Sequence, residues 1–173
     1  MTTNIKQRFF FCPKCGGKLE YKKHNDRFRP TCTSCSYIIY ENPIVGVAAI
    51  IYNHKGHILL GRRKGGKYQG MWCIPCGYLE YDEDVYVGVI REIKEETNLD
   101  IEPTSVFTVQ SNFHEPECHT VGIWFLSQIK GGKLEAGDDL LDVAYFDLLS
   151  YPTMAFPTDI KVIELLLNSN SKR

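Results

Sequence analysis

Three glutamates, Glu92, Glu95 and Glu96, lie close together in the middle of the 173-residue chain. In a helix, at about 100° per residue, their side chains fall within an arc of roughly 100° and share one face. Carboxylates this close repel one another and raise each other's pKa unless a cation neutralises them. Mg²⁺ and Mn²⁺ prefer oxygen ligands, so the cluster is a candidate site for a catalytic metal ion. A solvated surface helix with salt bridges is the alternative that these three residues alone leave open.

The residues around the glutamates predict an amphipathic helix that would hold them in place. Asp82 is the expected N-cap, and Glu83 and Asp84 would follow in the first turn, where the helix dipole favours negative charge. Asn98 is expected to end the helix, because Asn tolerates the left-handed conformation that follows a C-terminus. The apolar residues expected to pack on a core are Val85, Val89 and Ile93, with Val87 and Ile90 close by.

The sequence Gly77–Leu99 resembles the Nudix box, G-x5-E-x7-R-E-U-x-E-E-x-G-U, in which U is a bulky aliphatic residue. Glu83, Arg91 and the three glutamates occupy positions that the motif specifies. Asn98 replaces a glycine, which is a mild departure because Asn adopts positive φ angles readily. The resemblance implies a hydrolase that cleaves a nucleoside diphosphate linked to another group. Two or more Mg²⁺ or Mn²⁺ ions would be held by the three glutamates.

The same resemblance assigns roles to the residues around this metal site. The backbone carbonyl of Gly77 would be an additional metal ligand. Arg91 would hold a carboxylate in place, with Glu83 as its expected partner, and loss of Arg91 should lower activity roughly 10–100-fold. One of the glutamates, or an acid outside the box, would orient or deprotonate the attacking water. The candidate acids outside the box are Glu115, Glu117, Glu135, Asp138, Asp139 and Asp142.

Basic residues follow a short apolar segment before the box, at Arg62 and Arg63 and in the loop Lys64–Lys67. A basic loop near a carboxylate-rich metal site suits phosphate oxygens. In the Nudix family, basic residues at this position often face the substrate, so Arg62 and Arg63 are expected to contact it. An exposed, solvated loop is the alternative.

Four cysteines near the N-terminus form two C-x2-C pairs, Cys12 with Cys15 and, after sixteen intervening residues, Cys32 with Cys35. This spacing is typical of a zinc ribbon, in which four thiolates close a structural Zn²⁺ site. A segment of about 30 residues buries too little apolar surface to fold alone, so the metal would supply folding free energy. Two disulfides or a redox-active C-x2-C motif are the alternatives. The first residues lack the apolar core of a secretory signal, so we expect a reducing, cytoplasmic location.

Charge divides the chain into two modules. Residues 1–41 hold eight Lys and Arg against three acids, a net charge of +5, whereas residues 42–173 carry −6. We expect a zinc ribbon over residues 1–41 and a hydrolase domain over residues 42–173. The basic ribbon is compatible with nucleic-acid contact, but solubilising charge is the favoured interpretation. No apolar run approaches the length of a membrane span, so no membrane partner is expected.

Strands and helices alternate along the second module. Ile44–Tyr52 predicts a buried strand, and the turn that follows should return it as a hairpin with His57–Gly61. Together with the box helix, the elements predict an α/β fold, an α/β/α sandwich with a mixed sheet, which the Nudix resemblance also implies. The remaining strands are expected at residues 105–112, 118–129 and 141–146, before a terminal helix at residues 158–167 capped by Thr158.

The expected substrate is a small nucleotide. The zinc ribbon and the form P-x-G-Y-L-E around Gly77 resemble Nudix enzymes of the FAD and ADP-ribose pyrophosphatase type, so ADP-ribose or FAD is favoured. NADH pyrophosphatases and NAD-cap RNA decapping enzymes carry S-Q-P-W-P-F-P-x-S after the box. This chain has V-Q-S-N-F at residues 109–113, so these enzymes are the second choice. A catalytically inactive nucleotide-binding regulator is a third alternative. Homodimers are common in the family, and the sequence leaves the oligomeric state open.

Overall fold

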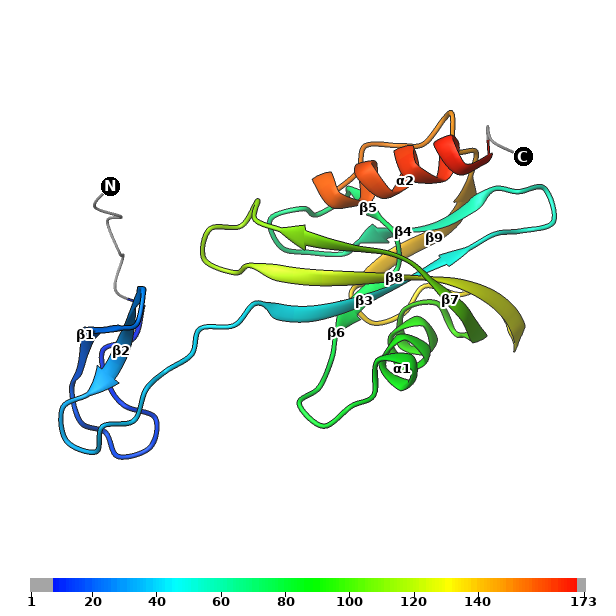
Figure 1. Ribbon diagram of the computed structural model, residues 1–173. Coiled ribbons are helices and arrows are strands. Elements are labelled where there is room, and N and C mark those ends of the chain that lie inside the picture. The colour runs from blue at the N-terminus through cyan, green and yellow to red at the C-terminus, as the bar shows by residue number, and fades with distance from the viewer. Residues whose placement is uncertain (1–7, 171–173) are drawn as a thin grey trace. The chain divides into compact units, whose positions relative to one another are not determined.

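The computed structural model describes residues 8–170, and the chain divides into two compact units between Asn42 and Pro43. The first unit contains the paired cysteines, and the second contains the box helix and two larger sheets (Figure 1). Among the described residues, no helix is long and apolar enough to cross a membrane.

A two-stranded antiparallel hairpin forms the first unit, with β1 (Leu19–His24) paired to β2 (Arg27–Cys32). Asn25 takes a left-handed conformation, with a φ of 55°, in the short turn between them, as tight hairpins favour. The buried apolar residues of this unit are Cys12, Leu19 and Cys32, with Ile39 packed against them. A core this small suits a unit that a metal ion holds together.

Two sheets make up the second unit. The larger sheet has the strand order β6-β3-β8-β7, and it is mixed because β3 runs parallel to β8 while the other neighbours are antiparallel. The smaller sheet is antiparallel, with the order β5-β4-β9. The strands are β3 (Ile44–Ile51), β4 (Ile58–Arg63), β5 (Trp72–Cys73), β6 (Cys76–Tyr78), β7 (Leu99–Asn112), β8 (Thr120–Gly132) and β9 (Leu140–Phe146).

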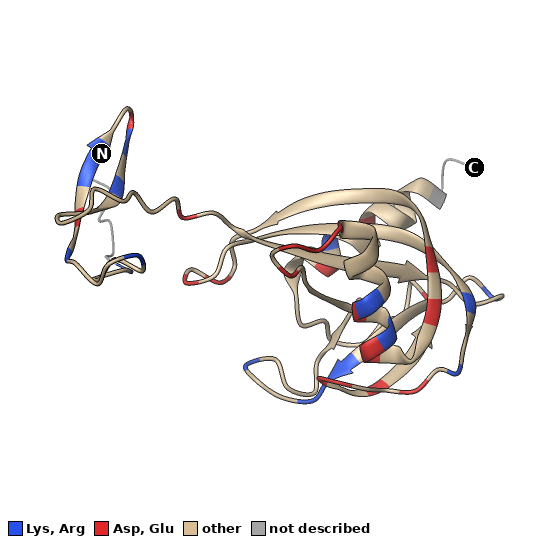
Figure 2. Cartoon of the chain, turned by 90° about the horizontal axis from the view of Figure 1, so that it is seen from below, with Lys and Arg blue, Asp and Glu red and all other residues tan. Residues whose placement is uncertain are grey.

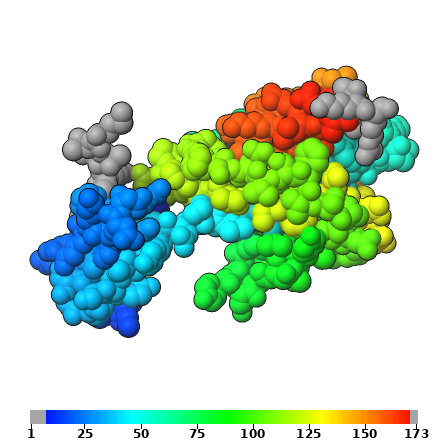
Figure 3. Space-filling view, in the orientation of Figure 1, coloured from blue at the N-terminus to red at the C-terminus, as the bar shows by residue number. Residues whose placement is uncertain are grey.

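The two helices, α1 (Val85–Thr97) and α2 (Pro157–Asn170), lie on opposite sides of the strands (Figures 1 and 3). Successive residues of β3 belong to two separate cores, since Ile50 clusters with residues of α2 and Ile51 with residues of α1. Both faces of β3 are therefore buried, which explains why its sequence is an apolar run. The predicted α/β/α sandwich with a mixed sheet is confirmed.

The predicted hairpin between β3 and β4 is confirmed at its turn and returning strand, but the two strands do not pair along their length. The turn itself is present, since the Asn53 side chain accepts backbone hydrogen bonds from Lys55 and His57 at 2.9 and 3.0 Å. Within the described residues, a single bridge between Tyr52 and Ile58 joins the two segments, and β4 then pairs with β5 and β9. β4 instead belongs to the smaller sheet, between β5 and β9.

Helix α1 begins later than predicted. Asp84, and not Asp82, is the N-cap, because its side chain accepts a hydrogen bond from the backbone N–H of Tyr86 at 2.8 Å. The predicted C-terminus is confirmed. Asn98 has a left-handed φ of 56°, and its N–H donates to the carbonyl of Lys94 at 3.0 Å.

One side of α1 is buried. Val89 and Ile93 are fully buried, as predicted, and Val85 packs against the same core. Val87 and Ile90 are 57% and 40% exposed, so the prediction that they join this contact is wrong. At about 100° per residue, Val87 lies about 160° and Ile90 about 100° from Val89, which is outside the buried stripe.

Among the other boundaries that differ from the predictions, two have a clear physical reason. β7 begins at Leu99, directly after the helix, and not at Ser105. The sequence did not reveal this early start, because register irregularities such as the one at Pro103–Ser105 break the two-residue periodicity by which a strand is recognised. α2 begins at Pro157, so Thr158 lies in its first turn and is not the cap. Proline suits the first helical position, where the backbone N–H has no helical partner.

Candidate active site and metal centre

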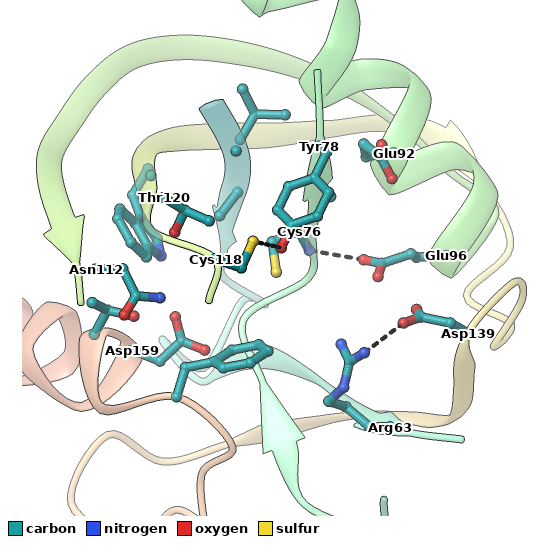
Figure 4. Close-up of a pocket in the computed structure, with 18 of the residues that line it drawn as sticks. Arg63, Cys76, Tyr78, Glu92, Glu96, Asn112, Cys118, Thr120, Asp139 and Asp159 are labelled. Carbon is teal, nitrogen blue, oxygen red and sulfur yellow. Dashed lines mark hydrogen bonds and ion pairs between the residues drawn. The ribbon is translucent and has the colours of Figure 1, made fainter. Parts of the chain in front are cut away.

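A cavity of about 430 Å³ lies within the second unit. Its walls come from β3, β6 and β8, from helix α1, from the loops that precede β8 and β9, and from the start of α2. Carboxylates from α1 and from Asp139 gather at one end, and Asp159, Asn112 and Thr120 lie at the other (Figure 4). Two chemically different regions are therefore joined in a single cavity.

Glu92 and Glu96, one helical turn apart on α1, both project into this cavity beside β6. Glu96 is 2% exposed, and its carboxylate accepts a hydrogen bond from the backbone N–H of Cys76 at 2.8 Å. Glu92 lies against Gly77, where a Cβ would stand 2.0 Å from the carboxylate carbon. A side chain at position 77 would therefore displace the Glu92 carboxylate from this place.

Arg91 connects the glutamates to the loop before the helix. Its Nε and Nη2 atoms donate to the two carboxylate oxygens of Glu83 at 2.8 and 2.7 Å, so the predicted ion pair is present. Its Nη1 contacts Glu92 at 2.8 Å and Glu95 at 3.2 Å. The pairing with Arg91 lowers the pKa of Glu83. Glu95, whose side chain is 49% exposed, does not line the cavity and contacts Arg91 through the Nη1 atom.

The two buried carboxylates of α1 both have raised pKa values. Burial raises the pKa of Glu92, and the neighbouring charge of Glu95 raises it further, while Arg91 opposes both effects. Burial also raises the pKa of Glu96 well above its usual value, and negative neighbours that include Asp139 add to the effect. A divalent cation among these oxygens would offset the repulsion and favour the charged forms, so this donor set fits a hard metal ion.

Acids outside the box reach the cavity through a loop that docks on the end of α1. The backbone N–H of Gly137 donates to the carbonyl of Glu96 at 2.9 Å, and this contact places Asp138 and Asp139 on the cavity wall. Asp139 Oδ2 pairs with Arg63 Nη2 at 2.9 Å (Figure 4). Asp139 Oδ1 is buried and has no hydrogen-bond partner among the described residues. It is therefore available to a ligand or to water.

The other candidate acids are less well placed. Glu115 lines the cavity, but its Oε1 atom already accepts hydrogen bonds from Lys67 Nζ at 2.6 Å and from Tyr68 OH at 2.5 Å. These two donors lower the pKa of Glu115, with Lys67 as the larger cause. The candidates that do not line the cavity are Glu117, Glu135 and Asp142.

The two arginines at the end of β4 have different environments. Arg63 lines the cavity, and its guanidinium carbon lies 5.4 Å from the ring centroid of Phe156. Arg62 is exposed and does not line the cavity, so the expected substrate contact is retained for Arg63 alone. The register of β4 against β9 is irregular between Arg62 and Arg63. Such a bulge changes the direction of a side chain, which explains why these two neighbours have different environments.

The far end of the cavity contains a buried acid that sequence analysis missed. Asp159 is 2% exposed, and its Oδ2 accepts a hydrogen bond from the backbone N–H of Ile74 at 3.0 Å. Burial raises the pKa of Asp159 to about 7. The indole of Trp124 lowers that pKa, but its Nε1 makes no hydrogen bond of good geometry to any described residue. Nothing in the sequence indicated this role, because acids are common in the first turn of a helix, where the helix dipole favours negative charge.

The four cysteines of the first unit form a compact cluster. The Sγ atoms of Cys12, Cys15, Cys32 and Cys35 all lie within 4.8 Å of one another. Cys12 and Cys35 are 3.7 Å apart, and Cys15 and Cys32 are 3.5 Å apart. A disulfide bond would be about 2.05 Å long, so the thiols are free. Among the described residues, this is the only group of three or more His, Cys, Asp or Glu that comes so close.

Both cysteine pairs sit on turns of the same kind. The N–H of Gly16 donates to the carbonyl of Cys12 at 2.9 Å, and the N–H of Ser36 donates to the carbonyl of Cys32 at 3.1 Å. Gly16 and Ser36 share a left-handed conformation, with φ angles of 73° and 58°. Two equivalent turns that present four sulfur atoms to one point fit a tetrahedral Zn²⁺ ion.

Comparison with protein families and with individual proteins identifies both units. A NUDIX domain model matches residues 42–166, and a Nudix N-terminal zinc-ribbon model matches residues 11–41. The chain is 39% identical over 121 residues to an ADP-ribose pyrophosphatase from Methanocaldococcus jannaschii, a match that covers 69% of this chain and 71% of that protein.

Two further matches extend over most of the chain. The NAD-capped RNA hydrolase NudC from Vibrio atlanticus is 30% identical over 153 residues, which cover 88% of this chain but only 54% of that protein. A crystal structure of a NUDIX hydrolase from Nitrosomonas europaea is 28% identical and superposes with a TM-score of 0.79, covering 91% of this chain and 88% of that one.

Proposed function

The chain belongs to the Nudix hydrolase family and has the family's N-terminal zinc ribbon, and from this premise we propose which bond it cleaves. It hydrolyses the pyrophosphate of ADP-ribose or FAD, releasing a nucleoside monophosphate and a second phosphorylated product. The observation that carries this proposal is the single cavity that joins the carboxylates of α1 to a buried polar region around Asp159. One end suits the pyrophosphate and the other suits the nucleoside.

Carboxylates of the box would hold the catalytic metal. We assign Glu92, Glu95 and Glu96 to Mg²⁺ or Mn²⁺, with the carbonyl of Gly77 as a further ligand. The bound metal supplies positive charge that neutralises the pyrophosphate and its transition state. Arg91 keeps two of these carboxylates oriented through its contacts with Glu92 and Glu95.

Arg63 and Asp139 complete the pyrophosphate end. Asp139 is the best-placed acid outside the box for orienting or deprotonating the attacking water, because its Oδ1 atom has no partner among the residues described. Arg63 offers guanidinium donors to phosphate oxygens. The water oxygen attacks one phosphorus while the bridging P–O bond breaks. The proton of the water passes to a carboxylate, and the departing phosphate takes the bond electrons.

Buried polar groups at the far end support a nucleoside site. The Trp124 indole N–H lacks a hydrogen-bond acceptor among the described residues, and the Asp159 carboxyl lies beside it. Buried polar groups in proteins are nearly always paired, and the polar edge of a nucleobase would pair these. Asn112 and Thr120 add further hydrogen-bonding side chains to the same end.

Two considerations rank the substrates. The relative from Methanocaldococcus jannaschii, matched over 71% of its length, is named an ADP-ribose pyrophosphatase, which supports ADP-ribose. NAD-capped RNA is the second candidate because the Vibrio atlanticus relative is named for it, although the match covers 54% of that protein. We place the enzyme in the cytoplasm, where the free thiols of the zinc cluster would stay reduced.

The test is hydrolysis by the purified protein of ADP-ribose, FAD, NADH and NAD-capped RNA with Mg²⁺ or Mn²⁺, with products separated by chromatography. We expect AMP from ADP-ribose or FAD. Glu96→Gln keeps the size of the side chain but removes its charge. It should lower kcat more than about 100-fold, which exceeds the decrease in activity expected when a residue that only supports a metal ligand is replaced. The matched control is Glu164→Gln on the exposed face of α2, which should keep full activity.

The outcomes separate the parts of this proposal. A folded and fully active Glu96→Gln protein would contradict the assignment of Glu96 to the catalytic metal. Cleavage of NAD-capped RNA without cleavage of ADP-ribose or FAD would favour the second candidate. A folded protein that binds nucleotides but cleaves none of these substrates would indicate a regulator.

A further inference from the structure

The zinc ribbon has a basic face that the hydrolytic reaction does not use. In the hairpin, Lys22 stands directly opposite Arg29, and His24 stands directly opposite Arg27. Side chains that face each other across an antiparallel pair lie on the same face of the hairpin. Lys22, Arg27 and Arg29 therefore share one face, and Figure 2 shows basic residues on both strands. We call Lys22, His24, Arg27 and Arg29 the basic face.

Charge repulsion makes this arrangement costly for the isolated ribbon. Like charges directly opposite each other destabilise an antiparallel pair, and Lys22 and Arg29 are such a pair. Glu20 lies on the same face, but it is 4.0 Å from Lys22, and both side chains are at least half exposed. A surface ion pair of this kind contributes little. The face retains an excess of positive charge that an external polyanion would neutralise.

One exposed aromatic ring contacts this basic face. The guanidinium of Arg29 lies 4.6 Å from the ring centroid of Tyr40, and Tyr40 is 61% exposed. An arginine stacked on an exposed ring presents a flat surface together with a positive charge, which is the combination that binds unpaired bases. The exposed aromatic residues of this unit are Phe9, Phe10, Phe11, Phe28, Tyr37 and Tyr40.

We propose that the zinc ribbon binds single-stranded nucleic acid, with the basic face following the phosphate backbone and Tyr40 stacking on a base. Charge alone would suit any polyanion, but exposed rings add affinity only for a ligand whose bases are unstacked. A duplex or an acidic peptide lacks such bases. This surface lies outside the catalytic cavity, so the proposal stands independently of which nucleotide the enzyme hydrolyses.

The test is fluorescence anisotropy of the full-length, zinc-loaded protein with a labelled 20-nucleotide oligouridine at 50 mM and 200 mM salt. Lys22→Gln with Arg29→Gln should weaken binding roughly 10-fold at 50 mM salt and flatten the salt dependence, because fewer counterions are released. The matched control removes two exposed lysines of the hydrolase unit, Lys55→Gln with Lys161→Gln, and should change affinity less than about twofold.

Tyr40→Ala separates stacking from charge. It should weaken binding at least about fivefold while leaving the salt dependence unchanged, since it removes a ring and no charge. Every variant should keep its zinc content, its thermal unfolding profile and its rate of hydrolysis, which excludes misfolding as the cause of weaker binding.

Several results would overturn the proposal. These are no binding of the oligouridine at 50 mM salt, equal weakening by the basic-face and control pairs, and equal affinity for a duplex of the same length. Efficient competition by polyglutamate would show that charge alone is recognised. Self-association that the basic-face pair abolishes would assign this face to a second copy of the chain.

Discussion

At the level of single residues, the three glutamates of α1 have the same side chain but differ in how deeply it is buried. The Glu96 carboxylate is almost fully buried and bonded to a backbone N–H, and the Glu92 side chain is 11% exposed beside Gly77. The Glu95 side chain, one position from Glu96, is 49% exposed. The first two have raised pKa values because burial penalises their charge. We therefore expect metal binding to depend mainly on Glu92 and Glu96, with a smaller contribution from Glu95.

Asp159 gives a prediction that pH can test. Its pKa is raised to about 7 by burial, against 3.8 for an ordinary aspartate, so between these values the folded protein binds a proton that the unfolded chain releases. Its contribution to the free energy of unfolding is therefore largest below about pH 4, falls as the pH rises towards 7, and is constant above that. The difference between the two pKa values corresponds to about 4 kcal/mol.

Replacing Asp159 with Asn removes the titrating group but keeps an acceptor for the N–H of Ile74. The Asp159→Asn protein should match the original near pH 4 and become more stable than it by up to about 4 kcal/mol at pH 8. Urea unfolding between pH 4 and pH 8.5 measures this difference. Other buried acids titrate in both proteins and cancel in the comparison, so unfolding free energies that stay parallel across this range would contradict the assignment.

At the level of elements, the positions of the candidate acids outside the box depend on the contact between a loop and helix α1. The loop before β9 is fixed to the C-terminal end of α1 by the hydrogen bond from Gly137 to the carbonyl of Glu96. A Cβ on Gly137 would lie 2.3 Å from the backbone oxygen of Glu95, so the loop contacts the helix too closely for any side chain. The positions of Asp138 and Asp139 follow from this contact.

Gly137→Ala should therefore displace the loop from α1 and move Asp139 out of the cavity. We expect kcat/KM to fall roughly 10–100-fold, as when an outer-shell partner is lost, and stability to fall by about 1–3 kcal/mol through overpacking. Steady-state hydrolysis and thermal unfolding measure these effects. The control is Gly65→Ala in the exposed basic loop, where a Cβ meets no atom within 4 Å. Normal activity in the Gly137→Ala protein would show that the loop contact is unimportant.

At the level of the whole molecule, the two units differ in what stabilises them. The hydrolase unit has two large apolar clusters, on either side of β3, whereas the ribbon has a cluster of three buried residues, two of which are cysteines of the metal site. All residues that line the catalytic cavity belong to the hydrolase unit. Zinc should therefore support the fold of the ribbon and leave catalysis largely unaffected.

Zinc removal tests this division. A zinc-selective chelator, used with excess Mg²⁺, should unfold the ribbon, so that its backbone amide NMR signals lose their chemical-shift dispersion. The amide signals of the hydrolase unit should keep their chemical shifts. Hydrolysis should stay within about threefold of its original rate, since no ligand of the catalytic site is lost. Binding of the oligouridine should disappear with the ribbon fold. Loss of the hydrolase resonances together with those of the ribbon would show that the two units fold as one.

The sequence by itself determined the features that depend on neighbouring residues. The spacing of the cysteines predicted the cluster, helical periodicity placed Val89 and Ile93 in the core, and Asn98 marked the end of the helix. The pairing of Arg91 with Glu83 was also predictable, because both belong to one motif and lie only eight residues apart. The alternation of strands and helices predicted the sandwich, since apolar faces of these elements have few ways to be buried.

Only the tertiary structure decided contacts between distant segments. Arg63 meets Asp139 and Ile74 meets Asp159, which is 85 residues away from it, because strands of different sheets and the start of α2 converge on one cavity. Local periodicity carries no information about which distant side chains become neighbours, nor about the burial that changes their pKa. Those properties arise only when the packed cores fix the elements against one another.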